Sequence, residues 1–228
     1  LKYYKIGVGY GFLASLFSPH DIYDDFVKKF GDGLDAFFPV ADTEIGKIGM
    51  TSCYDGYMPE IYRGLVMNGA EVILRPTSWF DPWIGVHGCL DWWSLQARMR
   101  ALDNNCYIIA PNTAEFSPRI SAFPKHFNGG GDSLIVDYRG RIISRASTSG
   151  ETIVPGIINI EQLRDFRKNA EYPHFTLIHL RTELFQKIYE KPIWPKNLWL
   201  KKLPETAEEF EEASKIARKR LQERGIII

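Results

Sequence analysis

Short apolar runs alternate with amphipathic stretches through the middle of the chain. The apolar runs predict strands at 47–52, 71–75 and 106–111, and helical periodicity predicts helices at about 58–67 and 91–104. Further strand signals follow at 133–137, 141–144 and 152–158, with a turn at 138–140 joining the first two. Strand–helix–strand alternation followed by a hairpin predicts an α/β fold, with a mixed sheet flanked by helices.

The two ends of the chain have different patterns from the middle. Residues 1–6 have the pattern of a strand, and the sequence at 18–21 predicts a helix start that runs into 22–30 and stops at Gly31. Residues 191–204 contain three Pro and two Trp, which predicts an extended arm, and 205–224 predict a charged amphipathic helix.

We therefore expect a domain at 1–177 and a C-terminal arm and helix at 178–228. The arm and helix either cover their own domain or dock on a neighbouring subunit, which makes this region a candidate for oligomerisation. The chain also begins with Leu1 inside a predicted strand, without a cap or polar lead-in. This start indicates a truncated or processed sequence, or one part of a split protein; a natural domain boundary is the alternative.

Composition narrows the possible functions. The 228 residues carry 28 basic and 28 acidic side chains, so net charge gives no argument for a nucleic-acid or membrane partner. Cys53, Cys89 and Cys106 are odd in number and irregularly spaced, which fits neither a disulfide framework nor a zinc site. No apolar run is long enough to cross a bilayer and no signal peptide is visible, so a cytoplasmic location is expected.

The stretch 49–63 carries the clearest chemical signal. An apolar strand ends at Cys53, a turn follows at Asp55-Gly56, and a helix begins near Pro59. A residue on such a strand-to-helix elbow is pushed toward a cleft, where the helix N-terminus favours a thiolate and backbone N–H groups can hold an oxyanion. The pattern makes Cys53 a candidate nucleophile, and a small buried side chain is the other interpretation of a lone Cys at a strand end.

Five segments, in order, resemble the nitrilase superfamily of carbon–nitrogen hydrolases. They are Cys53-Tyr54-Asp55 with Pro59-Glu60 and Arg63, Gly69-Ala70-Glu71 with its apolar strand, the helix 96–105 with Asn112 after the next strand, the loop 129–133, and the turn Asp137-Tyr138-Arg139-Gly140. The resemblance covers residues 1 to about 168. Cys53-Tyr54-Asp55 is similar to the amidase-type branch, and closest to the aliphatic-amidase and formamidase pattern.

The resemblance implies a four-layer α-β-β-α sandwich and a metal-free, cofactor-free hydrolase that uses Glu, Lys and Cys. Leu1-Lys2-Tyr3-Tyr4-Lys5 resembles the family strand that carries the catalytic Lys, which implies Lys5 for this role beside Cys53. A solvated lysine at a strand end is the other interpretation of Lys5. The family's Glu lies N-terminal to that Lys, so the resemblance implies that a preceding segment or a separate N-terminal chain supplies it.

Other residues are candidates for the pocket. The backbone N–H of Tyr54 is the expected second oxyanion donor. Trp79 and Asn112 follow strands of the family's pocket, and a core aromatic is the other interpretation of Trp79. His20 is a candidate for a second pocket position, although a helix N-terminus at 18–21 explains the same residue.

The resulting prediction is hydrolysis of a small-molecule amide through a Cys acyl-thioester, by a homo-oligomer. One alternative is an N-carbamoyl amide hydrolase, in which Arg75 or Arg119 would hold a substrate carboxylate. An alternative from another class is a catalytically inactive structural or regulatory subunit.

Overall fold

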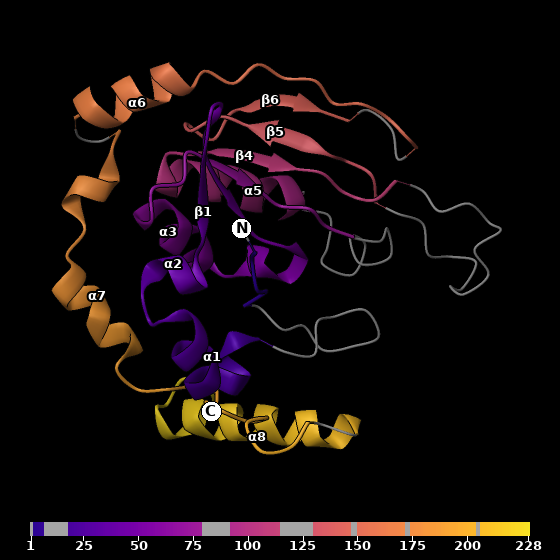
Figure 1. Ribbon diagram of the computed structural model, residues 1–228, viewed down its shortest axis with the longest axis vertical. Coiled ribbons are helices and arrows are strands. Elements are labelled where there is room, and N and C mark those ends of the chain that lie inside the picture. The colour runs from indigo at the N-terminus through magenta and orange to yellow at the C-terminus, as the bar shows by residue number, and fades with distance from the viewer. Residues whose placement is uncertain are drawn as a thin grey trace.

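The computed structural model describes most of the chain as an α/β unit, with the sheet, its covering helices and the C-terminal helix seen together in Figure 1. The residues that it describes are 2–6, 18–78, 92–114, 130–146, 150–171, 174–203 and 206–228. All structural statements below concern these ranges.

Six strands form one mixed sheet in the order β1-β2-β3-β4-β5-β6. They are β1 (Val40–Thr43), β2 (Gly46–Met50), β3 (Val72–Leu74), β4 (Tyr107–Ala110), β5 (Leu134–Val136) and β6 (Ile142–Arg145). β2, β3 and β4 run parallel, while β1, β5 and β6 are antiparallel to their neighbours. The carboxyl ends of β2, β3 and β4 therefore meet at one edge of the sheet, where parallel α/β proteins hold their ligands.

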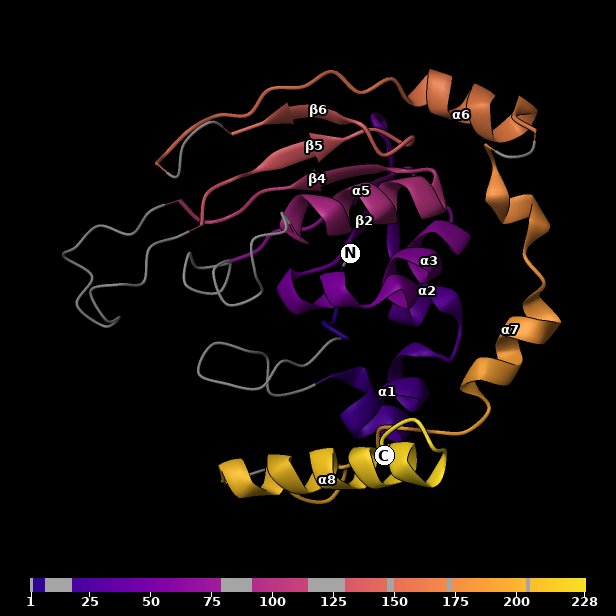
Figure 2. The same cartoon turned by 180° about the vertical axis from the view of Figure 1, so that it is seen from behind.

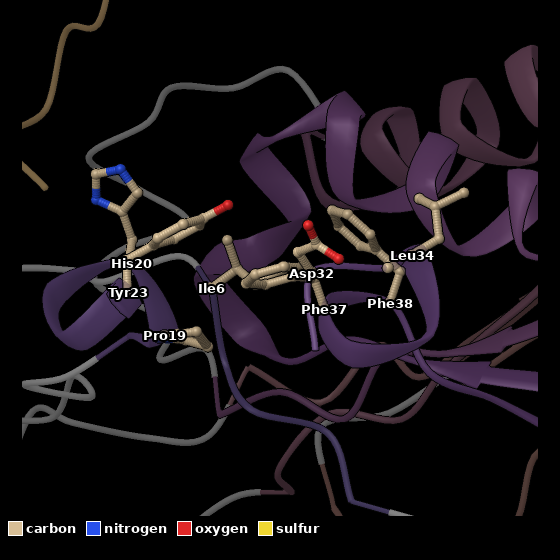
Figure 3. Close-up of a pocket in the computed structure, with 9 residues that line it drawn as sticks. Ile6, Pro19, His20, Tyr23, Asp32, Leu34, Phe37 and Phe38 are labelled. Carbon is tan, nitrogen blue, oxygen red and sulfur yellow. The ribbon is translucent and has the colours of Figure 1, made fainter. Parts of the chain in front are cut away.

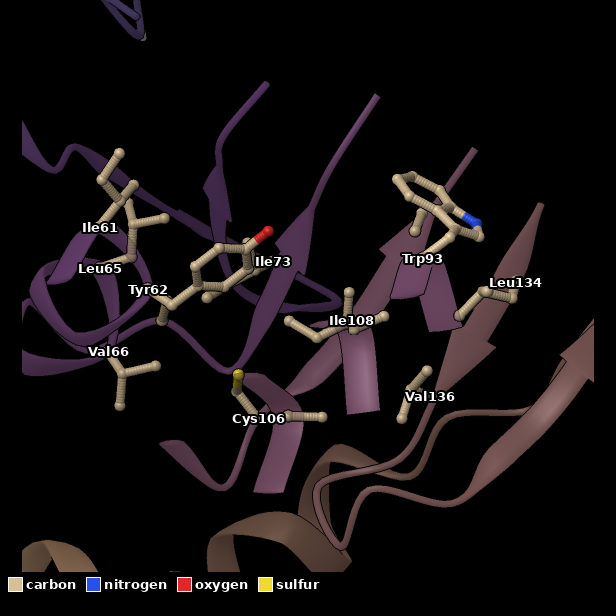
Figure 4. Packing of buried hydrophobic residues seen from close by; sticks show 14 of the residues in the cluster. Ile61, Tyr62, Leu65, Val66, Ile73, Trp93, Cys106, Ile108, Leu134 and Val136 are labelled. Carbon is tan, nitrogen blue, oxygen red and sulfur yellow. The ribbon is translucent and has the colours of Figure 1, made fainter. Parts of the chain in front are cut away.

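Helices α3 (Pro59–Met67) and α5 (Trp92–Asn104) pack on one face of this sheet. Their core joins Tyr62 and Leu65 to Ile73 and Ile108 of the central strands (Figure 4). On the opposite face, a second cluster brings the fully buried Leu163 of α6 (Ile160–Asn169) against β3 and β4. The mixed sheet flanked by helices is confirmed, and it makes up one β layer of the expected sandwich.

The boundaries of the central elements lie within two residues of their predicted ranges, but two predicted strands are wrong. Residues 2–6 belong to no strand. Residues 152–158 are also unpaired: a Cβ on Gly156 would come 2.8 Å from Cδ1 of Ile135, so this segment crosses the sheet face at β5. An apolar run lying on a sheet face has the composition of a strand without its hydrogen bonds.

The remaining elements lie toward the two ends of the chain. They are η1 (Pro19–Ile22), α1 (Tyr23–Phe30) and α2 (Leu34–Phe37) before the sheet, and η3 (Thr176–His179), α7 (Thr182–Tyr189) and α8 (Ala207–Glu223) after it. The helices predicted at 22–30 and 205–224 are confirmed as α1 and α8. The sequence did not indicate α2, α6, α7 or β1.

The C-terminal arm lies on its own chain. Both views place α8 next to α1 (Figure 1 and Figure 2). The backbone N–H of Asn197 donates to His20 O, that of Trp199 donates to Asp21 O, and the Asn197 side chain bonds Asp24. Among the described helices, none is long and apolar enough to cross a membrane.

Candidate active site

Cys53 lies at the carboxyl edge of the parallel strands. Its backbone N–H donates to Pro76 O at 3.1 Å, which places it beside the chain that leaves β3. Cys53 opens the 3-10 helix η2 (Cys53–Tyr57), and α3 starts two residues after η2 ends. The predicted strand-to-helix elbow is thus present, as a 3-10 turn followed by an α-helix, and the Cys53 side chain is partly exposed.

The backbone of Cys53 is in the left-handed region, with φ at 51°. The other described non-glycine residues with positive φ are Asn105, Asp132 and Asn197, which are residue types that tolerate it. A cysteine in this conformation is strained, and strain of this kind persists only where the surroundings enforce it. Two contacts do so here: the N–H of Cys53 is held by Pro76 O, and its C=O accepts a 3.2 Å hydrogen bond from Nη2 of Arg75.

The Asp55 carboxylate stabilises the elbow through hydrogen bonds. Its carboxylate is fully buried, and Oδ2 accepts hydrogen bonds from the Ser52 N–H at 3.0 Å and from the Tyr3 hydroxyl at 2.6 Å. Burial, together with the negative charge of Asp55, raises the pKa of Tyr3 well above its usual range, so the phenol remains a donor. These contacts leave Asp55 a bracing residue.

The Tyr3–Asp55 bond brings the segment of Lys5 to the elbow. Tyr4 packs its ring on Phe26 at 5.4 Å, and Ile6 lines a cavity on the same helical segment. Tyr3 instead points at the elbow, and Lys5 follows two residues later with a half-buried side chain.

Tyr54 occupies the first turn of η2, where backbone N–H groups have no partner within the helix. Its ring packs against Tyr57 at 5.2 Å, and Tyr57 in turn stacks on Trp92 at 5.7 Å. These aromatic contacts hold η2 against α5.

Asn112 lies at the same edge, one strand further on, paired with Thr77 in an isolated bridge. Its side-chain amide donates to Gly131 O at 2.9 Å, and its backbone N–H donates to Oγ of Ser133 at 2.9 Å. These bonds tie the loop before β5 to the edge that carries the nucleophile.

His20 lies in η1, away from the elbow. Its ring lines a cavity of about 380 Å³ with mainly apolar and aromatic neighbours, including Tyr23, Phe37 and Phe38 (Figure 3). Burial lowers the pKa of His20. The backbone N–H of His20 donates to Oγ of Ser18 at 3.1 Å, so the predicted helix N-terminus at 18–21 is confirmed. No described contact joins this cavity to Cys53.

Arg75 is a residue whose role the sequence did not reveal. It was a candidate clamp for a substrate carboxylate, but its side chain is completely buried. The guanidinium lies 4.5 Å from the ring centre of Trp93 and donates from Nη2 to Cys53 O and to Oε1 of Gln96. The one signal was a charged residue at the end of an apolar strand.

Two of the predicted positions cannot be placed: Trp79 and Arg119 lie outside the described residues. Within the described ranges, no group of three or more His, Cys, Asp or Glu side chains is placed to hold a metal ion. The described part of the candidate site contains the thiol of Cys53 on a strained backbone and the buried guanidinium of Arg75.

Comparisons with known proteins identify the family of the chain. A family model described as carbon-nitrogen hydrolase matches residues 9–168. A probable nitrilase of Schizosaccharomyces pombe is 27% identical over 70% of this chain and 53% of its own length. An omega-amidase of Saccharomyces cerevisiae is 30% identical over 56% of this chain and 40% of its own length.

A crystal structure of a carbon-nitrogen hydrolase from Helicobacter pylori has the same fold, with a TM-score of 0.55. It is 22% identical, and the match covers 68% of this chain and 53% of that one. The chain thus spans about half, or less, of the length of the proteins that it matches.

Proposed function

Because the chain belongs to the carbon–nitrogen hydrolase family, we propose that it carries the nucleophile of an amidase-type enzyme that cleaves a small-molecule amide. The observation that carries this proposal is the conformation of Cys53. A partly exposed thiol in a strained left-handed backbone, at the carboxyl edge of parallel strands, is the arrangement of a reactive group.

In the first step the general base takes the proton of the Cys53 thiol, Sγ attacks the amide carbonyl carbon, and a C–S bond forms as the carbonyl oxygen becomes an oxyanion. The C–N bond then breaks, and ammonia or an amine leaves with a proton from a general acid. In the second step water attacks the thioester carbon and gives up a proton to the same group acting as base. The C–S bond breaks, Sγ takes this proton back from the base, and the carboxylic acid leaves.

The oxyanion of each tetrahedral intermediate needs donors that are already oriented. We assign this role to the N–H of Tyr54, in the first turn of η2, and to the ammonium of Lys5. Support for Lys5 comes from the hydrogen bond of Tyr3 to Asp55, which anchors its segment at the elbow.

The general base is proposed to come from a preceding segment or from a partner chain, as the family resemblance implies. The match to about half the length of the relatives is compatible with this division of the site. The proposed enzyme is a homo-oligomer, and its proposed substrate is a small amide.

One observation bears on the N-carbamoyl alternative. A substrate carboxylate would need an accessible cation, and Arg75 is buried against Trp93 and the Cys53 carbonyl. That alternative then depends on Arg119, which lies outside the described residues. Cleavage of a simple amide is therefore the preferred proposal.

The test is ammonia release from formamide, short aliphatic amides and N-carbamoyl amino acids, with mass analysis of trapped acyl adducts. The chain is assayed alone and with the segment or partner that carries the base. We expect an adduct on Cys53, loss of both signals in Cys53→Ala, and their retention in the matched variant Cys106→Ala. Absence of adduct and ammonia in every combination would favour the inactive subunit.

Lys5 is tested in the same assay. Lys5→Met should lower kcat by about 100-fold, the usual cost of an oxyanion donor. The matched control is Lys2→Met, which removes an exposed lysine of the same segment and should leave kcat unchanged. Equal effects of the two substitutions would contradict the role of Lys5.

A further inference from the structure

Arg75 is a buried cation with few partners. Its side chain is completely buried, its hydrogen bonds go to Cys53 O and Gln96 Oε1, and it lies over the Trp93 ring; none of these three groups is an anion. Nε and Nη1 are buried without a hydrogen-bond partner. Burial lowers the pKa of Arg75, and its guanidinium contacts Cys53 through the carbonyl oxygen.

Burying such a side chain lowers the free energy of unfolding. A buried guanidinium with unsatisfied N–H groups costs free energy that an apolar side chain of similar volume would not cost. Its position therefore calls for an explanation other than stability, and the group it touches at the elbow is the backbone of the nucleophile.

The surroundings are shaped to hold this guanidinium. A Cβ on Gly56 would lie 1.9 Å from Nη2 of Arg75, so the backbone of η2 packs directly on the charged group. On the other side the guanidinium stacks on Trp93 and is oriented by Gln96, both on α5. The elbow and α5 thus enclose the guanidinium on both sides.

Arg75 and Pro76 together hydrogen-bond both backbone groups of Cys53. Pro76 O accepts from the N–H of Cys53, and Nη2 of Arg75 donates to its C=O. The main chain of Arg75 is itself fixed in the sheet, because its N–H donates to Ile109 O at 2.8 Å. The central strands therefore fix the position of Arg75 and, through it, the backbone conformation of Cys53.

We propose that Arg75 is the positioning residue of the nucleophile: it holds the Cys53 carbonyl, and thereby the left-handed backbone that presents the thiol to substrate. This inference rests on the proposed function of Cys53. Arg75 touches no reacting atom in this role; it acts through the peptide of Cys53, and its buried positive charge also favours the negative charge that develops nearby.

Three variants test the proposal. Arg75→Met removes the charge and the hydrogen bond, Arg75→Lys keeps the charge without the planar fork, and Gly56→Ala displaces the guanidinium while leaving it in the chain. The matched control is Arg167→Met, because Arg167 also donates to backbone carbonyls, those of Asn105 and Ala70, far from the elbow.

Two readouts are compared in folded protein, with thermal unfolding measured alongside. One is the rate at which iodoacetamide labels Cys53, followed by peptide mass, and the other is kcat and KM for amide cleavage. We expect Arg75→Met to lower the labelling rate and kcat about tenfold, with KM changed less than about threefold. Arg75→Lys should restore part of the loss, Gly56→Ala should resemble Arg75→Met, and Arg167→Met should change neither rate.

Labelling and kcat within about twofold of wild type in Arg75→Met would overturn the proposal, as would equal losses in Arg167→Met. If Arg75→Met does not fold, Arg75→Lys and Gly56→Ala decide by the same criteria. If wild type cleaves no amide, the proposed function fails, whereas the labelling comparison still tests whether Arg75 positions Cys53.

Discussion

The hydroxyl of Tyr3 donates a 2.6 Å hydrogen bond to the buried carboxylate of Asp55, 52 positions further along the chain. This bond joins the N-terminal segment to the elbow that carries Cys53. It therefore links the segment of Lys5 to the nucleophile, two parts of the proposed site that lie far apart in the sequence.

Tyr3→Phe should show how much the Tyr3–Asp55 hydrogen bond contributes to stability. The buried carboxylate would lose one of its donors, and a hydrogen bond to a charged group contributes about 1.5–3 kcal/mol. We expect the free energy of unfolding in urea to fall by about that amount. Tyr4→Phe is the matched control, because its ring packs on Phe26 and Phe30 and the substitution keeps the ring. Equal unfolding midpoints for the two variants would contradict the prediction.

The sequence predicted the parts of the fold that local pattern determines. The apolar runs of β2–β5 and the elbow at Cys53 depend on periodicity, Pro and turn residues, which act over a few positions. β1 and α2 depend on tertiary packing: a Cβ on Gly64 of α3 would lie 2.6 Å from Cγ of Phe38, so the residue between α2 and β1 is fixed by a distant helix.

The candidate site was predictable to the same extent. Cys53 could be found from its neighbours in the sequence, whereas Arg75 could not be interpreted, because its contacts with Cys53, Trp93 and Gln96 come from three separate elements. A charged residue at the end of an apolar strand has the same local sequence whether its side chain points to solvent or into the core.

Low pH should weaken the ion pair between Arg164 of α6 and Glu71 at the start of β3. Burial alone would raise the pKa of Glu71, but hydrogen bonds from Arg164 and the Lys47 N–H outweigh it and lower the pKa below 4.5. A carboxylate whose pKa is lower in the folded state than in the unfolded state stabilises the fold when the pH is above its unfolded-state pKa. This stabilisation is lost as the pH falls through its folded-state pKa.

Glu71→Gln should therefore lower the free energy of unfolding by about 1–2 kcal/mol at pH 7, allowing for the half-exposed Arg164. The difference from wild type should shrink as the pH falls below 4.5. Urea unfolding from pH 3 to 7 measures it. Glu161→Gln removes the exposed partner of the same arginine and should have little effect at any pH. A difference for Glu71→Gln that stays constant with pH would refute the assignment.

The two described cysteines should differ sharply in reactivity. Cys106 is fully buried in the core, and burial raises the pKa of its thiol to about 12, so almost no thiolate forms at neutral pH. Cys53 is partly exposed at the elbow. We expect iodoacetamide at pH 7.5 to label Cys53 in native protein and Cys106 only in urea, as resolved by peptide mass. Native labelling of Cys106 at a comparable rate would show that the core opens readily.

Asn197 should govern the attachment of the C-terminal arm. Its backbone is left-handed, with φ at 62°, and its side chain bonds both the N–H and the carboxylate of Asp24 at the start of α1. Asn197→Ala removes both bonds and leaves a residue that tolerates this backbone poorly. The bonds between the arm and η1 should then open more often.

Hydrogen exchange of the Trp199 amide, which donates to Asp21 O at 3.0 Å, measures this opening. We expect exchange to accelerate about tenfold in Asn197→Ala, and less in Asn197→Gly, which relieves the backbone strain and loses only the side chain. Lys196→Ala is the matched control, because its ion pair with Asp24 is exposed and contributes little. Equal exchange in Asn197→Ala and Lys196→Ala would mean that the arm is held by contacts other than Asn197.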